Sequence, residues 1–287
     1  HRLAVAILPY LRLVRAGALL SPAADVVASL CVLGAPWSLE AVRAVLASVA
    51  VYAAGMVWND FADRRRDAVV RPERPLPSGA IRPWVAAVLG TVLLAIGVVL
   101  APNPAFHGLL AGLVLLYDFV SKRVLALGAL NMGALRALNL WSVAPWFGGA
   151  EPVRQNLLLA ALCYAVYVLA VTILGAFEDD RTVRPRAVAN IQAAPLFAGL
   201  CGLWAVQGGL WPAPALAALP IAWFARTNAR IRVWDQAAIR RSMTRLLLGT
   251  LLFSALLCAA ADRWLEAVAI LLAIAPARAI AKRISLT

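Results

Sequence analysis

Long apolar stretches constrain this chain more than any other feature of its sequence. Ten of them, rich in Leu, Ala and Val, lie near 12–34, 39–59, 84–101, 105–121, 124–147, 157–177, 187–208, 211–225, 243–261 and 264–280. A segment of about 20 apolar residues can cross a hydrocarbon core of roughly 30 Å. Inside that core the backbone must hydrogen-bond within the protein, which leaves only helices or closed barrels. Strand alternation is absent, so the sequence predicts an all-α membrane bundle of nine to ten transmembrane helices; the last two stretches can also form one bent hairpin.

The composition excludes a soluble globular protein. Hydrophobic residues make up 63% of the 287 residues, the mean hydropathy is +0.82, and only 14% of the residues are charged. A soluble domain is typically about half apolar. No low-complexity segment and no polar domain interrupts the apolar pattern, so we expect a single transmembrane domain over residues 1–287.

The net charge of +13 reflects membrane topology rather than nucleic-acid binding. With the ten predicted spans, 23 Lys and Arg residues fall on one side of the membrane and three on the other. Cytoplasmic loops of membrane proteins carry such an excess of basic residues. The sequence therefore predicts a multi-pass protein of the inner (cytoplasmic) membrane whose polar, basic face is cytoplasmic, with no nucleic-acid partner.

An acidic motif closes the second predicted span. Its sequence is Asn59-Asp60-x-x-Asp63-x-x-x-Asp67. On a helix, residues three and four apart share one face, so the three carboxylates lie close together. Ionising all of them is unfavourable without a cation. Hard oxygen ligands suit magnesium, which typically takes one or two carboxylates together with phosphate oxygens. We interpret the motif as a magnesium site, since a merely solvated acidic face paired with Arg64–Arg66 explains three aligned carboxylates less well.

A proline-rich turn follows the acidic motif. It reads Arg71-Pro72-Glu73-Arg74-Pro75-Leu76-Pro77-Ser78-Gly79. Three prolines within six residues restrict the backbone to an extended, stiff path. Such a turn can hold Arg71 and Arg74 near the carboxylates, where guanidinium groups can fork onto phosphate oxygens.

Together the acidic motif and the turn resemble the UbiA superfamily of intramembrane aromatic prenyltransferases. The stretch Met132–Asn139 is similar to a bacterial branch, the EboC-like members. The resemblance implies a UbiA-like helix bundle that binds a polyprenyl diphosphate with magnesium (Mg2+) and transfers the prenyl chain to an acceptor. In this interpretation Asp60, Asp63 and Asp67 hold the metal and Asn59 orients a carboxylate or a phosphate oxygen.

Two further segments carry residues that the resemblance implicates. Tyr117, Lys122 and Arg123 end the fourth span, where the family shows Y-x-x-x-K-R; here the tyrosine stands one residue farther from the lysine. Lys122 and Arg123 would neutralise the leaving diphosphate. Glu178, Asp179 and Asp180 end the sixth span, where the family has a second aspartate motif, and Asp180 is a candidate metal ligand. Their spacing departs from the family's D-x-x-x-D-x-x-x-D, which leaves the number of metals open.

Polar residues inside the spans form a third group of candidates. Asp25, Arg136 and Asn139 lie in stretches that are otherwise apolar. An ionisable group there costs roughly 2.5–3.5 kcal/mol on insertion scales and usually faces an internal cavity. Asp25 and Arg136 either line the acceptor pocket or form a structural pair between helices. An aromatic acceptor would need a nearby base, and the sequence offers no well-placed histidine for this role. Asp25 or a carboxylate of the second acidic segment, Glu178–Asp180, is the leading candidate for the base.

The sequence and the resemblance therefore predict an enzyme, a magnesium-dependent prenyltransferase that lies in membrane lipid. Its substrates would be a polyprenyl diphosphate and a small, aromatic or polar acceptor of unknown identity. Two alternatives stay open. One is transfer of another group to or from a polyprenyl phosphate lipid. The other is a transporter with buried carboxylates, a class that often shows inverted repeats; no such repeat is visible, and the acidic motif lies at the membrane boundary.

Overall fold

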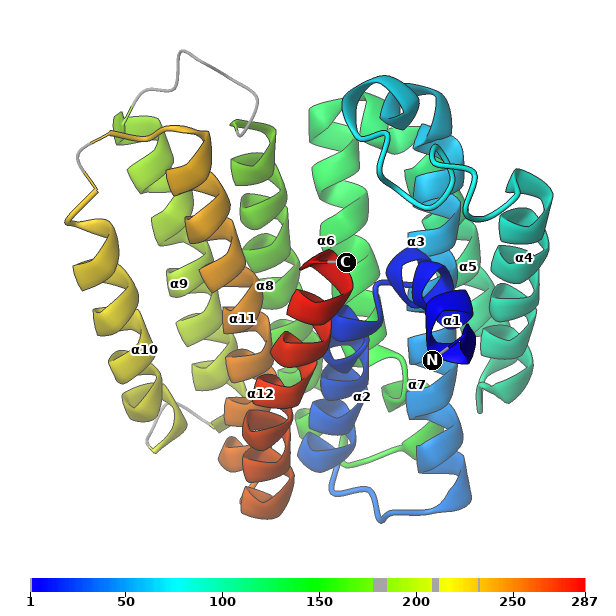
Figure 1. The fold of residues 1–287 in the computed structure, drawn as a ribbon. Helices are drawn as coiled ribbons and strands as arrows, with labels where there is room; N and C mark the ends of the chain where they lie inside the picture. The colour runs from blue at the N-terminus through cyan, green and yellow to red at the C-terminus, as the bar shows by residue number, and fades with distance from the viewer. Residues whose placement is uncertain (1, 178–184, 208–211, 232, 287) are drawn as a thin grey trace. The chain divides into compact units, whose positions relative to one another are not determined.

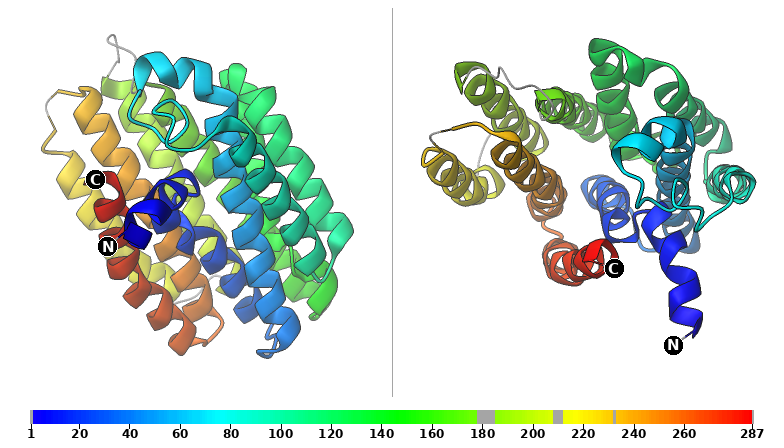
Figure 2. Two further views of the ribbon diagram at one scale, coloured as in Figure 1. Left: turned by 45° about the vertical axis from the view of Figure 1, so that its right-hand side comes forward. Right: turned by 45° about the horizontal axis from the view of Figure 1, so that its top comes forward.

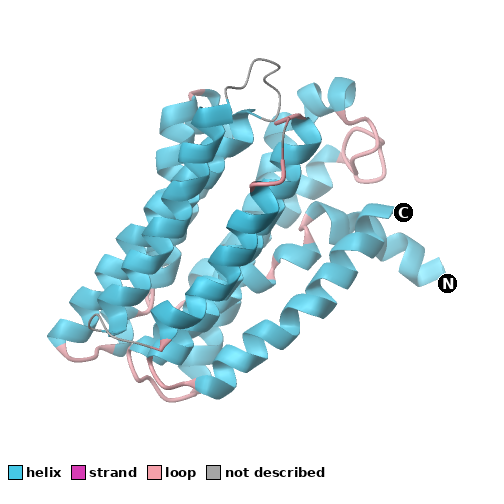
Figure 3. Ribbon diagram, turned by 90° about the vertical axis from the view of Figure 1, so that its left-hand side faces the viewer, coloured by secondary structure: helices cyan, strands magenta, loops and turns pink. Residues whose placement is uncertain are grey.

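The computed structural model describes residues 2–177, 185–207, 212–231 and 233–286. Within these residues the regular secondary structure is helical throughout, as Figure 3 shows. Seven helices are long and apolar enough to cross a membrane, and a bent pair near the N-terminus gives an eighth candidate. The all-α membrane bundle predicted from the sequence is confirmed.

Each of the ten predicted stretches corresponds to a helix or a pair of helices. The first, 12–34, contains the 3-10 turn η1 (Ala16–Ala18) and α2 (Leu20–Val32), and α1 (Arg2–Leu13) precedes it and overlaps only its first two residues. The next three are α3 (Leu39–Val70), α4 (Pro83–Leu100) and α5 (Pro104–Phe119); α5 is followed by η2 (Ser121–Arg123). The others are α6 (Leu125–Trp141) with α7 (Ala144–Phe147), α8 (Glu151–Ala176), α9 (Pro185–Gln207), α10 (Ala213–Asn228), α11 (Gln236–Ala260) and α12 (Trp264–Leu286). The helices α6 and α10, of 17 and 16 residues, are not among the seven candidates, whereas α5 counts together with η2 as a candidate of 20 residues.

The contacts divide the chain into two compact units. The first comprises residues 1–23, 37–120 and 272–287, and the second comprises residues 24–36 and 121–271. The single domain expected from the sequence stays a prediction.

In the first unit, α3 is the central element and packs against α4 and α5, which lie beside it in Figure 1. Small residues allow the close approach of α3 and α4. A Cβ at Gly97 would lie 2.6 Å from Val51 Cγ2 and 3.1 Å from the carbonyl oxygen of Ala47. At 32 residues α3 is much longer than the hydrocarbon core requires. Its C-terminal turns can therefore extend past the apolar region and carry the acidic motif.

In the second unit, α8 packs against α6 and α9, and α11 packs against α8, α9 and α10. The right-hand view of Figure 2 shows α9, α10 and α11, yellow-green to orange, nearly end-on and side by side. Gly133 allows α6 to approach α8 closely, because a Cβ there would lie 2.7 Å from the carbonyl oxygen of Ala165. Small residues at helix crossings are typical of membrane bundles.

The first predicted span is broken. The chain bends by 46° between residues 7–13 and 16–32. Arg15 stands at the break in the left-handed region, with φ +50° and ψ +55°. A non-glycine residue in this region is uncommon and is maintained only when its surroundings favour it. The side chain of Arg15 contacts Asp60 of the acidic motif, so this unusual backbone conformation occurs next to the candidate active site.

Candidate active site

The acidic motif occupies the C-terminal turns of α3, as the spacing predicted. Asp60 and Asp67 are each 5% exposed, whereas Asn59 and Asp63 are half-buried. Asp60 and Asp67 are two helical turns apart, so both project from the same face of α3. Two buried carboxylates on one face require compensating positive charge.

Arg74 supplies part of that positive charge. Its Nη1 lies 3.3 Å from Oδ1 of Asp60 and 2.6 Å from Oδ2 of Asp67. One guanidinium thus bridges the two buried carboxylates. The side chain of Arg74 is 21% exposed and those of both aspartates are 7% exposed, so water screens these pairs only weakly. The prediction that the turn holds Arg74 near the carboxylates is confirmed.

The proline-rich turn places Arg74 through its own packing. The amide of Arg71 donates to the carbonyl of Asp67 and ends α3. The amide of Ser78 then donates to the carbonyl of Arg74, which closes a compact turn. Leu76 and Ile81, 6% and 2% exposed, anchor this turn in an apolar cluster with Leu13, Val57 and Ala86. The side chain of Arg71 points into solvent as an exposed residue, so of the two predicted arginines the structure brings Arg74 onto the carboxylates.

Arg15 is a second cation at this site, and it was not among the residues predicted from the sequence. Its Nη2 lies 3.4 Å from Oδ1 of Asp60, although the two residues are 45 positions apart in the chain. The helix break directs this side chain toward the end of α3. In the sequence Arg15 counted only toward the basic excess of the N-terminus. Its position just before a Gly-containing interruption of the first apolar stretch is the signal that could have identified it.

Tyr117 and Asp118 bring the end of α5 to the same place. Tyr117 is half-buried and lies within electrostatic reach of Asp63 and Arg15. Asp118, which the sequence analysis did not select, is 3% exposed. The structure thus places Tyr117 beside the acidic motif, and its role in substrate binding stays a prediction.

The residues present fit a divalent cation bound together with phosphate, rather than a metal held by protein alone. No group of three His, Cys, Asp or Glu side chains converges to metal-binding distance among the residues that the structure describes. Asp60 and Asp67 nevertheless converge on one cationic group, the guanidinium of Arg74. Two carboxylates plus substrate oxygens are a typical donor set for magnesium. Asp60, Asp63 and Asp67 therefore stay the predicted metal ligands.

The other predicted site residues are not part of this cluster as described. Glu178, Asp179 and Asp180 lie outside the described residues. Lys122 and Arg123 lie in η2, which belongs to the second unit, and their role stays a prediction. Within this unit η2 packs closely on the first turn of α6. The absence of a side chain at Gly128 allows this, since a Cβ there would lie 3.0 Å from Cα of Lys122.

Asp25 and Arg136 form the pair that the sequence analysis considered. Nη2 of Arg136 lies 2.8 Å from Oδ2 of Asp25, which is 0% exposed. Three further donors reach the same carboxylate: Asn139 Nδ2 at 3.2 Å, the Tyr164 hydroxyl at 3.2 Å and the Ser254 hydroxyl at 3.1 Å. All of them belong to the second unit. A carboxylate that accepts from four neighbours and has no exposed surface is poorly suited to act as a base, so the geometry favours the structural pair over the acceptor pocket.

Comparisons with known proteins agree with the motifs and the fold. The sequence model described as the UbiA prenyltransferase family matches residues 19–257. Digeranylgeranylglyceryl phosphate synthase of Methanothermobacter thermautotrophicus is 35% identical over 149 residues, 47% of this chain and 50% of that protein. 4-Hydroxybenzoate octaprenyltransferase of Yersinia enterocolitica is 40% identical over 125 residues, 40% of this chain and 42% of that protein. The chain thus spans about half the length of the curated relatives that it matches.

Solved structures share the fold over nearly the whole chain. A UbiA homolog from Archaeoglobus fulgidus, bound to DMAPP and Mg2+, aligns with a TM-score of 0.60 at 15% identity, covering 88% of this chain and 99% of that chain. A UbiA homolog from Aeropyrum pernix K1 aligns with a TM-score of 0.60 at 19% identity, covering 85% and 96%. The EboC-like branch stays a prediction. Because the family's sequence model covers residues 19–257, this chain belongs to the UbiA prenyltransferase family.

Proposed function

We propose that this protein transfers a prenyl group from a polyprenyl diphosphate to a small acceptor within the membrane, in a magnesium-dependent reaction. The observation that carries the proposal is the cluster in which Arg74 bridges Asp60 and Asp67. Carboxylates that can hold a divalent cation stand next to guanidinium groups that can hold phosphate oxygens. A metal-bound diphosphate needs both kinds of group in one place.

Each residue of the cluster has a distinct task in this proposal. Asp60, Asp63 and Asp67 would hold Mg2+, and the cation would supply charge neutralisation for the diphosphate. Arg74 and Arg15 now pair with the carboxylates of the acidic motif. When the diphosphate binds, they turn toward its negatively charged oxygens, which then become their partners. The bond between the first prenyl carbon and the diphosphate oxygen breaks, and the electron pair leaves with the diphosphate. The acceptor's electron pair then forms the new bond to that carbon, and the acceptor gives up a proton.

The membrane bundle provides the second requirement, which is the exclusion of water from an electron-poor allylic carbon. The prenyl chain is apolar and lies among the helices or in the adjacent lipid. The proposed location is the cytoplasmic membrane, with the acidic motif on the basic, cytoplasmic side.

Relatives support the proposal. The Archaeoglobus fulgidus homolog binds DMAPP and Mg2+. The names of the curated relatives give two kinds of prenylated product, digeranylgeranylglyceryl phosphate and a derivative of 4-hydroxybenzoate. The acceptor of this chain is therefore best sought among glycerol-phosphate lipids and aromatic acids.

The test uses the full chain in lipid vesicles with radiolabelled farnesyl or geranylgeranyl diphosphate. Diphosphate release and label transfer are measured with Mg2+ and with a chelator, and with acceptors of both kinds. We expect Mg2+-dependent release, and a drop of roughly 100-fold or more in Asp60→Asn and Asp63→Asn, the scale seen when one charge-stabilising group is removed from an active site.

Asp262→Asn is the matched control, because Asp262 is an exposed aspartate in the turn between α11 and α12. It should retain full activity. Release that is insensitive to the chelator, or equal activity of Asp60→Asn and Asp262→Asn, would refute the proposed site. Accumulation of a solute inside the vesicles without diphosphate release would instead favour the transporter alternative.

A further inference from the structure

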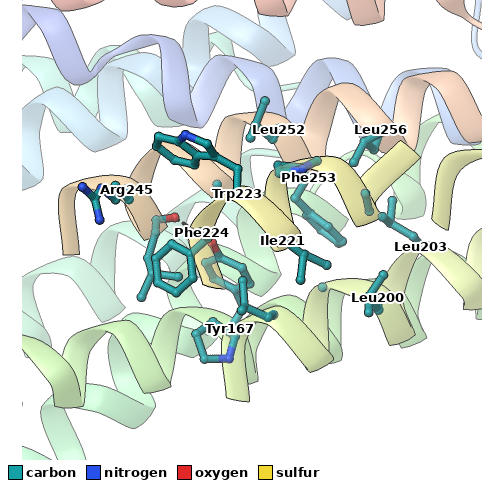
Figure 4. A pocket seen from close by; sticks show the side chains of 17 residues that line it. Tyr167, Leu200, Leu203, Ile221, Trp223, Phe224, Arg245, Leu252, Phe253 and Leu256 are labelled. Atoms are coloured by element: carbon teal, nitrogen blue, oxygen red, sulfur yellow. Dashed lines mark hydrogen bonds between the residues drawn. The ribbon is translucent and has the colours of Figure 1, made fainter. Parts of the chain in front are cut away.

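The second unit contains an apolar groove that the proposed reaction does not use. It runs between α9, α10 and α11, and Tyr167 of α8 contributes to its floor (Figure 4). Small residues contribute to its lining, Gly199 on α9, Ala217 on α10 and Gly249 on α11. A Cβ at Gly199 would meet neighbours only at 3.7–4.0 Å, whereas Gly249 makes room for Tyr167, whose hydroxyl a Cβ there would overlap. The hydroxyl of Tyr167 donates to the carbonyl of Leu246 at 2.7 Å, which keeps its ring packed over Gly249.

The groove has one polar end and one apolar end. Figure 4 shows Arg245 at one end and Leu203 and Leu256 at the other. Along α11 the distance from Arg245 to Leu256 is 11 residues, or about 16 Å at the helical rise. One leaflet is half of a hydrocarbon core of roughly 30 Å. The groove therefore has the depth of a lipid chain that lies in one leaflet.

Arg245 is positioned to bind an anion at the polar end. Its Nη1 donates to Oδ1 of Asn228 at 3.0 Å, and its guanidinium lies 5.5 Å from the centre of the Trp223 ring. Gln192 and Ser242 contact the amide of Asn228 in turn, at 2.6 and 3.3 Å. These contacts orient the guanidinium through one nitrogen, and a guanidinium carries further donors in a fork that suits phosphate.

The charge around the polar end identifies the side of the membrane. Residues 226–245 contain six arginines and one carboxylate, Asp235. Such a segment lies on the cytoplasmic side and is attracted to a leaflet with anionic lipids. Among the described residues that line the groove, Arg245 is the only charged one. A diphosphate with its metal needs carboxylates, which this lining lacks, so a single phosphodiester is the better match.

We propose that this groove binds an anionic phospholipid of the cytoplasmic leaflet, with one acyl chain between α9, α10 and α11 and the phosphate on Arg245. The lipid fills a hollow that the short helix α10 leaves against its neighbours. It thereby stabilises the second unit. This site is separate from the acidic motif and does not depend on the proposed reaction.

The test measures the melting temperature of the delipidated full chain in neutral detergent, with added phosphatidylglycerol or phosphatidylcholine that carry identical acyl chains. We expect saturating phosphatidylglycerol to raise Tm by roughly 5 °C more than phosphatidylcholine does. Native mass spectrometry should show one phosphatidylglycerol retained per chain.

Four variants, with Gly199→Leu as a substitute for one of them, separate the site from general effects of charge. Arg245→Gln should lose most of the difference between the two lipids, and Arg245→Lys should retain part of it. Leu252→Trp fills the groove and should abolish retention of phosphatidylglycerol. Gly199→Leu replaces it if Leu252→Trp fails to fold, because a Cβ at Gly199 meets Tyr167 and Phe253 only at ordinary contact distances of 3.7–4.0 Å. Arg241→Gln changes the same charge on the same helix at an exposed position outside the lining, and should behave like the wild type.

Three results would overturn the proposal. Equal effects of the two lipids, or an equal loss in Arg241→Gln and Arg245→Gln, would show diffuse attraction rather than a site. Displacement of the retained phospholipid by a prenyl diphosphate would assign the groove to the substrate. A dimer that Leu252→Trp dissociates, without any lipid preference, would show that a second copy of the chain covers the groove.

Discussion

Arg74 places one guanidinium between the carboxylates of Asp60 and Asp67, in a site where all three side chains are largely buried. Replacing Arg74 by Gln leaves two carboxylates close together without this partner. Removing one partner of a buried pair costs 3–5 kcal/mol; because Arg74 is 21% exposed, we expect a loss of about 2 kcal/mol in the free energy of unfolding. Thermal unfolding in detergent measures this loss.

The same variant also tests whether the carboxylates bind a metal. Millimolar Mg2+ should raise the Tm of Arg74→Gln more than that of the wild type, because the cation no longer competes with the guanidinium. Arg71→Gln, which changes an exposed arginine of the same turn, is the control and should respond like the wild type. An identical Mg2+ response in all three proteins would contradict a metal site between Asp60 and Asp67.

The pair of Asp25 and Arg136 makes a different prediction at the residue scale. Arg136→Met leaves Asp25 buried and uncompensated, and we expect a loss of about 3–5 kcal/mol. The double variant Asp25→Asn, Arg136→Met removes the charge as well, so it should be clearly more stable than Arg136→Met alone. A double-mutant cycle on Tm or denaturant midpoints measures this coupling. Additive losses would show that the two side chains do not act as a pair.

At the scale of elements, close helix crossings hold each unit together. A Cβ at Gly133 of α6 would lie 2.7 Å from the backbone carbonyl oxygen of Ala165 in α8, which cannot move without shifting the helix. We expect Gly133→Ala to destabilise the protein by about 1–3 kcal/mol, as overpacking does. Thermal unfolding in detergent is the measurement.

Gly112 of α5 is the matched control for this crossing. A Cβ there meets nothing within 4 Å. Gly112→Ala should therefore be neutral, or stabilising by up to about 1 kcal/mol, since alanine loses less backbone entropy in a helix. Equal effects of the two substitutions would mean that the α6–α8 approach is looser than the structure indicates.

At the scale of the whole molecule, the distribution of Lys and Arg predicts an orientation in the membrane, and this orientation can be tested. Three predicted spans, α4, α5 and α6, separate Ser78 from Glu151, so these two exposed residues should lie on opposite sides of the membrane. In a variant without the four native cysteines, Ser78→Cys should react with a membrane-impermeant maleimide only after the cells are opened. Glu151→Cys should react in intact cells, and labelling of both in intact cells would contradict the predicted orientation.

Features that depend on neighbouring residues could be predicted from the sequence. Apolar length predicts the helices, the distribution of arginines predicts an orientation, and the spacing of Asp60, Asp63 and Asp67 places them on one helical face. These are local properties, because helical periodicity and bilayer thickness act on each segment separately. The predicted position of Arg74 near the carboxylates is also local, because a short proline-rich turn connects it directly to the end of α3.

By itself the sequence determined the helical membrane architecture, the family and the acidic motif. Only the tertiary structure decided which distant residues meet. Arg15 reaches Asp60 across 45 positions, and the chain breaks at Arg15 with a positive φ. Ser254 reaches Asp25 across 229 positions because residues 24–36 and α11 belong to one compact unit. The hollow beside Arg245 likewise arises from three helices together. Such contacts depend on which helices pack together. An apolar helix face can be covered equally well by lipid or by another helix, so the apolar pattern of the sequence does not specify the neighbouring helix.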